Sequence, residues 1–391
     1  MNFVYLSPHF PSNYESFCIQ LRRLGVNVLG IADAPYEALS PRLREVLNEY
    51  YRIEDMHSYD QLLRACGYFT HRHGKIDRIE SHAEYWLETE ARLRTDFNIP
   101  GLRHDQIAWI KQKSLMKERF RKARVRVARG AVVHTLEEAR ELVRKTGYPV
   151  VAKPDIGVGA ASTYKLRGPD DLAHFFREKP QQDYILEEFI DGELMSFDGL
   201  TNREGELVFC ASHVFSQGIM ETVTRDDHIY YYSVREIPPD LEEAGRRVLK
   251  AFEVRERFFH FEFFRARKDG GLVALEVNMR PPGGLTTDMF NYSNDIDIYR
   301  EWANVVVNNR FDASYSRPYH CCYVGRKSHR HYIHDLPEIL DRFGYCICHH
   351  EAIHSIFRAA IGDYGYLVRS PDLDEVRRVA AFILEEHVPV A

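Results

Sequence analysis

Apolar and polar residues alternate along the segment LVALEVNMR (272–280), and this period of two predicts a β-strand. The apolar set of one parity is Leu275, Val277 and Met279, and the polar set of the other parity is Glu276, Asn278 and Arg280. Because successive strand side chains point to opposite faces, the three polar groups share one face. Burying them without compensation would cost several kcal/mol, so the pattern predicts a bound group on that face.

The preceding segment FFHFEFF (258–264) alternates in the same way, with His260 and Glu262 on the face opposite to three phenylalanines. The turn KDGG (268–271) makes the two strands antiparallel neighbours, so Glu262 and Glu276 are expected to face each other, joined by Asn278. Two carboxylates and an amide oxygen are ligands that suit Mg²⁺. The alternative is a buried Glu–Arg pair that balances its own charge.

The first hundred residues alternate predicted strands and helices, which favours a parallel α/β unit ending near residue 101. Its predicted strands are 2–8 and 27–33, and its predicted helices are 13–25, 58–74 and 83–97.

Beyond residue 101 the pattern mixes helices with antiparallel strands. We expect helices at 107–123, 135–147 (with a capping box from Thr135 to Glu138) and 240–252, a strand at 148–154, and two antiparallel strands within 183–214. Three strand-like pieces and a final amphipathic helix are expected within 311–391.

A second candidate site lies in VVAKPDIGVGAAS (150–162), where a lysine ends an apolar strand and a loop of small residues follows. Small residues let backbone N–H groups approach phosphate oxygens, and the lysine adds positive charge. The candidate phosphate-binding residues are Lys153, Gly157, Gly159 and Ala160. The segment is neither a Walker loop nor GxGxxG opening a helix, and a glycine-containing hairpin turn explains it equally well.

A third candidate is ILEEFIDGE (185–193), which includes Glu187. Its apolar residues could pack on an adenine ring while the backbone at Glu188 and Ile190 reads the base edge, and Glu193 could accept hydrogen bonds from ribose. Taken alone, the segment is an ordinary strand and turn.

Composition narrows the classes of partner. The 391 residues include 52 Lys and Arg against 58 Asp and Glu, and the net charge of −6 does not favour nucleic acid or membrane. The N-terminus has no signal-peptide pattern, and no apolar run reaches the roughly 18–20 residues of a membrane span. Seven scattered cysteines do not form a disulfide framework. We therefore expect a soluble, cytoplasmic protein of roughly two or three domains.

The order of these motifs resembles the ATP-grasp superfamily over roughly residues 105–310. The resemblance implies ATP and Mg²⁺ as cofactors, with Mn²⁺ as a substitute. It implies nucleotide contacts from Lys113, Lys153 and the segment Glu187–Glu193, metal ligation by Glu262, Glu276 and Asn278, and stabilisation of the phosphate or the tetrahedral intermediate by Arg280.

The implied fold is α/β, with a Rossmann-like N-terminal domain over 1–101. An ATP-grasp domain follows over 102–310, with α+β lobes at about 125–190 and about 191–310, and a C-terminal α+β domain covers 311–391.

Most members of the superfamily are ligases that activate a carboxylate as an acylphosphate and join it to an amine, and dimers are common among them. The His-x-Glu pattern at His260 resembles L-amino acid ligases, which implies amino-acid or small-peptide substrates. His260 could orient the acyl carboxylate or accept the amine's proton. The alternative is a purely structural histidine that is hydrogen-bonded beside the metal site. Phosphotransfer to a small molecule and bicarbonate activation are the alternative reactions.

Two further segments carry open interpretations. We expect a lid or substrate loop at 217–232, with Glu221 and Arg225 as contacts. The C-terminal histidines and cysteines could bind zinc, although they lack a CxxC pair; the preferred interpretation is a domain that closes the substrate pocket. The cluster comprises His320, Cys321, Cys322, Cys346, Cys348, His349, His350 and His354.

Overall fold

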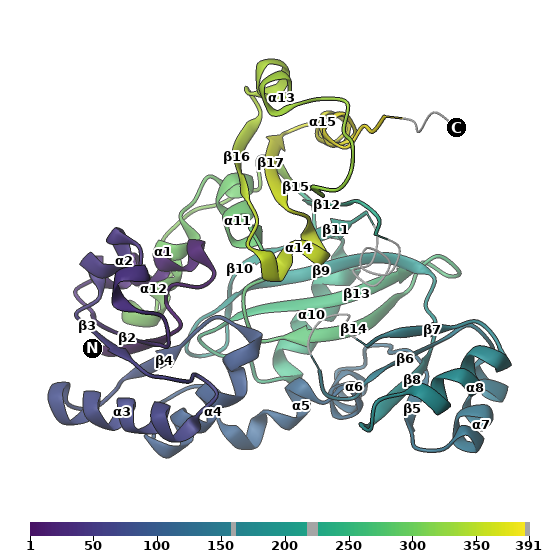
Figure 1. The fold of residues 1–391 in the computed structure, drawn as a ribbon, viewed down its shortest axis with the longest axis horizontal. Coiled ribbons are helices and arrows are strands. Elements are labelled where there is room, and N and C mark those ends of the chain that lie inside the picture. Colours follow the sequence, from purple (N-terminus) through teal and green to yellow (C-terminus); the bar gives the residue numbers. More distant parts are fainter. Residues whose placement is uncertain (158–161, 217–225, 388–391) are drawn as a thin grey trace.

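The computed structural model describes residues 1–157, 162–216 and 226–387. The N-terminal region is a parallel sheet in the order β3-β2-β1-β4 (Figure 1), which confirms the parallel α/β expectation. Its strands are β1 (Asn2–Leu6), β2 (Asn27–Ala32), β3 (Glu49–Arg52) and β4 (Arg78–Glu80), and its helices are α1 (Glu15–Arg23), α2 (Pro41–Val46), α3 (Tyr59–His73) and α4 (Leu87–Asp96). The hydrophobic pattern missed α2, β3 and β4, because four- and three-residue strands such as EYYR and RIE are too short to show an alternation.

A second, antiparallel sheet has the order β5-β8-β6-β7. It contains β5 (Gly130–Val133), β6 (Val150–Pro154), β7 (Tyr164–Leu166) and β8 (Tyr184–Glu188), with α7 (Leu136–Thr146) and α8 (Pro169–Glu178). Apolar residues of both helices join those of the strands in one core cluster. The capping box of Thr135 and Glu138 at the start of α7 is confirmed.

The largest sheet runs β14-β13-β9-β11-β12-β15-β17-β16, and β10 pairs with β9. Its strands are β9 (Gly192–Thr201), β10 (Leu207–Ala211), β11 (His213–Phe215), β12 (Ile229–Ser233), β13 (Phe258–Ala266), β14 (Leu272–Asn278), β15 (His320–Arg326), β16 (Ile347–Ala352) and β17 (Tyr364–Ser370). The antiparallel pair predicted within 183–214 is present as β9 and β10, joined by the turn NREG (202–205), but the number of strands was wrong: the segment also contains β8, which belongs to the smaller sheet, and β11.

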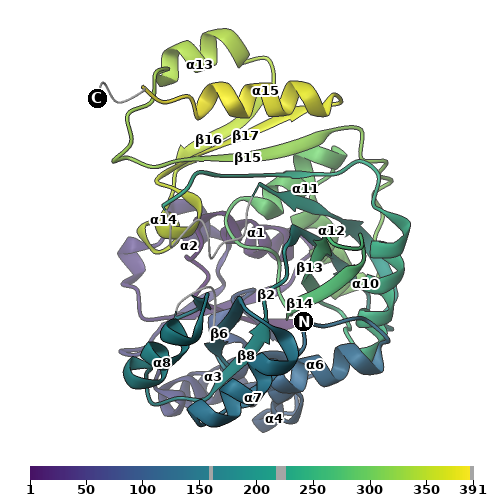
Figure 2. The same cartoon turned by 90° about the vertical axis from the view of Figure 1, so that its right-hand side faces the viewer.

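Further helices lie around this large sheet. They are α10 (Pro239–Ala251), α11 (Thr286–Asn294), α12 (Ile298–Asn308), α13 (Leu336–Phe343), α14 (Arg358–Ile361) and α15 (Leu373–Ile383). Figure 2 shows α13 and α15 covering β15, β16 and β17. Because β15 pairs with β12, residues 311–391 extend the same sheet, and the three-domain division remains a prediction. No helix in the described part of the chain combines the length and apolarity that crossing a membrane requires.

Two predicted elements are interrupted near the candidate site. The helix expected at 107–123 is divided into α5 (Ala108–Lys111) and α6 (Lys113–Lys122), because Gln112 is extended and bridges Ile156. In β14, a bulge between Glu276 and Ala274 removes Leu275 from the predicted alternation. Ala274 therefore joins Val277 and Met279 in the core cluster, in the place predicted for Leu275.

Candidate functional site

The polar face of β13 and β14 has the predicted register. Glu262 lies opposite Glu276 and His260 lies opposite Asn278, which confirms the expected juxtaposition. The opposite face of β13 is apolar, since Phe259, Phe261 and Phe263 are all buried in the main core cluster. The strand period thus separates a packed face from a polar one that is available for chemistry.

The facing carboxylates are held close to lysine side chains. Burial raises the pKa of Glu276, and the neighbouring Glu262 raises it further, while Lys113 and Lys153 act in the opposite direction. Lys113 Nζ lies 3.9 Å from Glu276 Oε1. Two carboxylates and the Asn278 amide provide hard oxygen donors, and their mutual repulsion favours a bound cation. The residues present therefore fit Mg²⁺.

A second ionic cluster joins the smaller sheet to α6. Glu187 lies 3.0 Å from Lys153 Nζ through Oε2 and 2.7 Å from Lys117 Nζ through Oε1. Burial lowers the pKa of Lys153, but the carboxylates of Glu187 and Glu276 outweigh it and the pKa lies above its usual value. Burial alone would raise the pKa of Glu187, yet the two lysines hold it below the usual range. The cluster therefore presents buried, charged lysines.

Asp155 fixes the start of α6 beside this cluster. Its carboxylate accepts hydrogen bonds from Ser114 N (2.7 Å), Ser114 Oγ (2.8 Å) and Gln112 Nε2 (2.9 Å). Lys113 Nζ donates to the carbonyl of Gly157 at 3.1 Å, so the first residue of the predicted glycine loop lies against a candidate phosphate-binding lysine. Gly159 and Ala160 lie outside the described residues.

The predicted adenine and ribose contacts lie between the two sheets. Glu188 ends β8 and its side chain pairs with Arg129 at 2.6 Å. Within the described chain, the Ile190 backbone N–H has no hydrogen-bond partner, as expected of a donor available to a ligand. Glu193 is exposed on β9, opposite Arg265 of β13.

His260 belongs to a buried chain of polar groups. Its Nδ1 lies 2.6 Å from Asp198 Oδ1 and its Nε2 lies 3.3 Å from Glu262 Oε1. The second oxygen of Asp198 lies 2.7 Å from His213 Nδ1. Burial lowers the pKa of His260, but Asp198 outweighs burial and raises the pKa to about 9. Both ring nitrogens of His260 are therefore engaged.

Arg280 connects the polar face to the N-terminal region. Its Nη1 donates to the Pro281 carbonyl at 2.8 Å, and its Nε lies 3.9 Å from Glu84 Oε2. Glu84 is largely but not fully buried, and burial raises its pKa. An acid from the N-terminal region therefore faces the predicted catalytic arginine.

Sequence reasoning missed Lys117, Asp198 and Glu84 as functional candidates. Asp198 shares a parity with Ser196 among the mostly apolar residues in the middle of β9, and this signal could have found it. Glu84 has no local signal, because its relation to Arg280 depends on how two distant segments pack.

The predicted contacts Glu221 and Arg225 lie outside the described residues. In the C-terminal region, His349 pairs with Glu351 at 3.1 Å and His350 lies 2.7 Å from the Tyr364 hydroxyl. Among the residues that the structure describes, no three His, Cys, Asp or Glu side chains gather as a metal site. The zinc interpretation of the C-terminal cluster gains no support from these contacts.

Among known protein families, the model of the ATP-grasp domain matches residues 146–288 of this chain. An L-arginine-specific L-amino acid ligase of Bacillus subtilis is 24% identical over 243 residues, which cover 60% of this chain and 58% of that protein. The matched region is therefore less than two thirds of that relative's length.

Two solved structures share the fold of almost the whole chain. The L-amino acid ligase from Bacillus licheniformis has a TM-score of 0.77 at 14% identity, with 98% of this chain and 96% of that chain covered. The biotin carboxylase domain dimer of the Hydrogenobacter thermophilus 2-oxoglutarate carboxylase, a complex with MgADP and bicarbonate, has a TM-score of 0.69 at 17% identity, with 96% and 89% covered.

Proposed function

We propose that this chain, whose residues 146–288 form an ATP-grasp domain, is an ATP-dependent ligase that activates a carboxylate as an acylphosphate and joins it to an amine. The observation that carries the proposal is the direct pairing of Glu262 with Glu276 on the polar face of β13 and β14, with the buried Lys113 nearby. Facing carboxylates next to buried lysines suit the charge of a metal-bound nucleotide.

Each predicted site residue has a place in this proposal. Lys113, Lys153 and the glycine loop would hold the phosphates, and Lys117 joins them through Glu187. The backbone at Glu188 and Ile190 would hold the adenine, and Glu193 the ribose. Glu262, Glu276 and Asn278 would hold Mg²⁺, which neutralises charge on the β- and γ-phosphates when it is bound.

The chemistry then proceeds in two displacements. An oxygen of the substrate carboxylate attacks the γ-phosphorus and the bond to ADP breaks. The amine nitrogen then attacks the acylphosphate carbon, loses a proton and expels phosphate. Arg280 stabilises the oxyanion of that second step, and Glu84 keeps its guanidinium beside the site.

We propose that His260 orients a metal-binding carboxylate and does not act as the general base. Its contacts to Asp198 and Glu262 occupy both ring nitrogens, so neither is available to accept the amine's proton. His260 instead orients the Glu262 carboxylate, as partners of metal ligands commonly do.

The substrates, setting and assembly remain proposals. Similarity to an L-arginine-specific L-amino acid ligase supports amino acids or small peptides as substrates. The MgADP complex of a similar fold supports ATP with Mg²⁺, for which we expect Mn²⁺ to substitute, and the dimer formed by that biotin carboxylase domain supports a homodimer. Seven free thiols support a reducing, cytoplasmic setting.

The test is phosphate release from ATP and Mg²⁺ across amino acids and small carboxylates, singly and in pairs, with product masses. We expect release to require a carboxylate together with an amine, and the product mass to equal their sum less water. Glu276→Gln should abolish release, whereas Glu45→Gln, at an exposed position of α2, should leave it unchanged.

Other outcomes would replace the proposal. A phosphorylated product that forms from a single substrate and stays stable without an amine would indicate a phosphotransferase. Release that depends on bicarbonate alone as the acyl substrate would indicate a bicarbonate-activating enzyme.

A further inference from the structure

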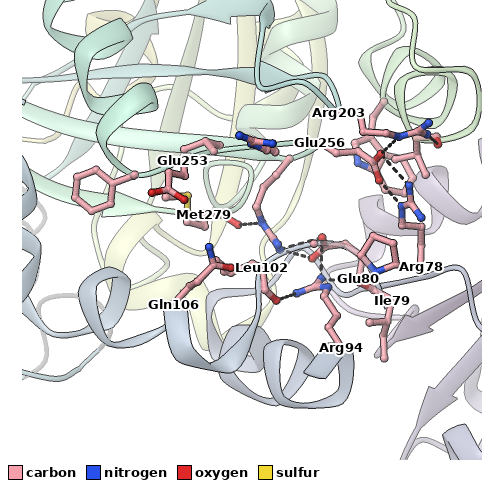
Figure 3. Close-up of a pocket in the computed structure, with 18 of the residues that line it drawn as sticks. Arg78, Ile79, Glu80, Arg94, Leu102, Gln106, Arg203, Glu253, Glu256 and Met279 are labelled. Atoms are coloured by element: carbon pink, nitrogen blue, oxygen red, sulfur yellow. Dashed lines mark hydrogen bonds and ion pairs between the residues drawn. The ribbon is translucent and has the colours of Figure 1, made fainter. Parts of the chain in front are cut away.

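A cavity of about 590 Å³ lies between the N-terminal domain and the loop that leads into β13 (Figure 3). Its walls come from β4, the end of α4, the 100–106 segment, the loop after α10 and helix α12. None of the predicted nucleotide, metal or catalytic residues lines it. The volume falls within the roughly 300–1,000 Å³ of small-molecule sites.

The lining carries more positive than negative charge. Five of the lining residues are arginines and three are glutamates. One of these glutamates, Glu253, has an exposed side chain and lies 3.8 Å from Arg119, which is not part of the lining. Without Glu253, two glutamates remain to balance the five arginines of the lining, so the lining keeps an excess of positive charge.

Two arginines of the lining share Glu256. Arg78 Nη2 lies 3.0 Å from its Oε2, and Arg203 Nε lies 2.8 Å from the same oxygen. Figure 3 shows Arg78 and Arg203 turned toward Glu256 from different elements. One carboxylate therefore balances two guanidinium groups, which leaves one positive charge on this wall.

A second pair of arginines meets at Glu80. Arg257 Nη2 donates to both Glu80 oxygens at 2.7 and 2.9 Å, and Arg94 Nη2 lies 3.3 Å from Glu80 Oε2. The buried Glu90 lies behind them, 2.9 Å from Arg94 Nη2. Burial and the neighbouring Glu80 raise the pKa of Glu90 to about 8, and this shift favours the neutral carboxyl beside the two guanidinium groups.

Donors remain for a ligand. Over the described ranges, Arg255 makes no hydrogen bond or ion pair, and the Nη1 group of Arg257 has no hydrogen-bond partner. Arg257 is only 8% exposed. Its guanidinium is held in place by Glu80 and by the hydrogen bond of 2.7 Å from its Nε to the Met279 carbonyl. A guanidinium fixed in this way is prepared for an anion, since little rotamer freedom is lost on binding.

We propose that this cavity binds a small anionic ligand, whose phosphate or carboxylate group contacts Arg257 Nη1 and Arg255. The remaining volume accommodates the rest of a small phosphate ester or dicarboxylate. Arg257 also donates a hydrogen bond to the carbonyl of Met279, the residue that precedes Arg280. An anion bound to Arg257 is therefore connected to the predicted catalytic arginine through this side chain. This inference does not depend on the proposed ligase reaction.

The test is calorimetric titration of the full chain, without nucleotide, with inorganic phosphate and separately with succinate. The predicted active site also carries cations, so the variants must separate the two sites. Arg255→Gln removes an exposed guanidinium that makes no hydrogen bond or ion pair with the described residues, and it should weaken binding of the recognised probe about tenfold. Arg203→Gln, which removes a second lining charge, should weaken it as well.

Two controls complete the design. Arg300→Gln removes an exposed arginine outside the cavity, and Lys153→Gln removes a cation of the predicted nucleotide site. Both should retain a binding event with the wild-type affinity. Binding of phosphate alone would assign a phosphate ligand, and binding of succinate alone a dicarboxylate. No binding of either probe, or binding that only Lys153→Gln removes, would overturn the proposal.

Discussion

Asp198 is a fully buried residue that links two imidazole rings, and one of these rings contacts the predicted metal ligand Glu262. We predict that Asp198→Asn weakens Mg²⁺ binding by about 10–100-fold, the usual effect of removing a partner that orients a metal ligand. The asparagine amide has one oxygen that accepts hydrogen bonds and one NH₂ group that only donates them. It therefore cannot accept from both imidazole rings, and the orientation of His260 is lost. Mn²⁺ binding followed by electron paramagnetic resonance measures this directly, without turnover.

Ser196→Ala is the matched control for Asp198→Asn. It removes the hydroxyl that donates to Asp198 Oδ2 at 2.6 Å, accepts from the His213 backbone N–H at 3.2 Å and lies 3.4 Å from His213 Nδ1, but it leaves both contacts between Asp198 and the imidazole rings in place. Its metal affinity should stay close to that of the wild type. Equal metal affinity in Asp198→Asn and the wild type would refute the positioning role.

Site residues could be predicted where a local sequence pattern determines their position, and they could not where distant segments pack together. Glu262, Glu276 and Asn278 could be predicted because a strand's period of two and one short turn determine which side chains meet. Lys117 could be placed on the correct helix face, but its pairing with Glu187 depends on a different sheet. Glu84 approaches Arg280 only through packing between segments nearly two hundred residues apart, and no local pattern encodes that approach.

At the scale of elements, the start of α6 links stability to the site. Asp155→Ala removes the acceptor of three hydrogen bonds at this end and should cost about 1–2 kcal/mol of unfolding free energy. Because α6 carries Lys113 and Lys117, we also expect kcat/KM for ATP to fall. Urea unfolding and steady-state kinetics measure the two effects.

Thr135→Ala supplies the control for Asp155→Ala. It removes the N-cap of α7, which has a comparable energetic cost, but α7 carries no candidate site residue. We expect similar destabilisation with unchanged kcat/KM. If both variants lose activity equally, the effect of Asp155 is a general loss of folded protein.

Helix packing gives a second prediction at this scale. A Cβ at Gly245 of α10 would lie 2.1 Å from the ring of Phe197 in β9, so Gly245→Ala should cost about 1–3 kcal/mol. Gly67 of α3 has no atom within 4 Å of the equivalent position, and Gly67→Ala should stabilise by about 0.4–1 kcal/mol. Opposite shifts of the urea midpoint are expected, and shifts of the same sign would contradict this packing.

Elements with long, regular patterns were predicted well, whereas interruptions were not. The helix at 107–123 has helical periodicity throughout, yet it breaks at Gln112 because that backbone bridges Ile156. The bulge at Leu275 likewise depends on pairing with β13. Both interruptions arise from tertiary partners that override a local preference.

At the scale of the whole molecule, charged groups join the N-terminal domain to the rest of the chain. Arg257 donates to Glu80 and lies 3.4 Å from Glu90, while Arg94 contacts the same two acids. The extension of the large sheet by β15 is likewise a long-range feature. Neither could be predicted from the sequence, because both depend on which distant surfaces meet.

Glu90 gives this interface a distinct pH dependence. Burial and Glu80 raise its pKa from 4.5 to about 8 in the folded chain. Between these values the folded state keeps a proton that the unfolded state has lost, so this contribution to stability is complete below about pH 4.5 and is lost as the pH rises toward about 8. Glu80, whose pKa is lowered, titrates below that window.

Glu90→Gln removes the titrating group while keeping its shape. The unfolding free energy of this variant should therefore lack the decline between about pH 4.5 and pH 8 that Glu90 causes. We therefore expect the wild type to lose urea stability relative to Glu90→Gln between pH 5 and pH 8.5, while Glu45→Gln follows the wild type at every pH. A constant difference between wild type and Glu90→Gln across the range would mean that Glu90 is already ionised at pH 5. The interface would then hold two carboxylates against two guanidinium groups, and the positive excess of the neighbouring cavity would be reduced.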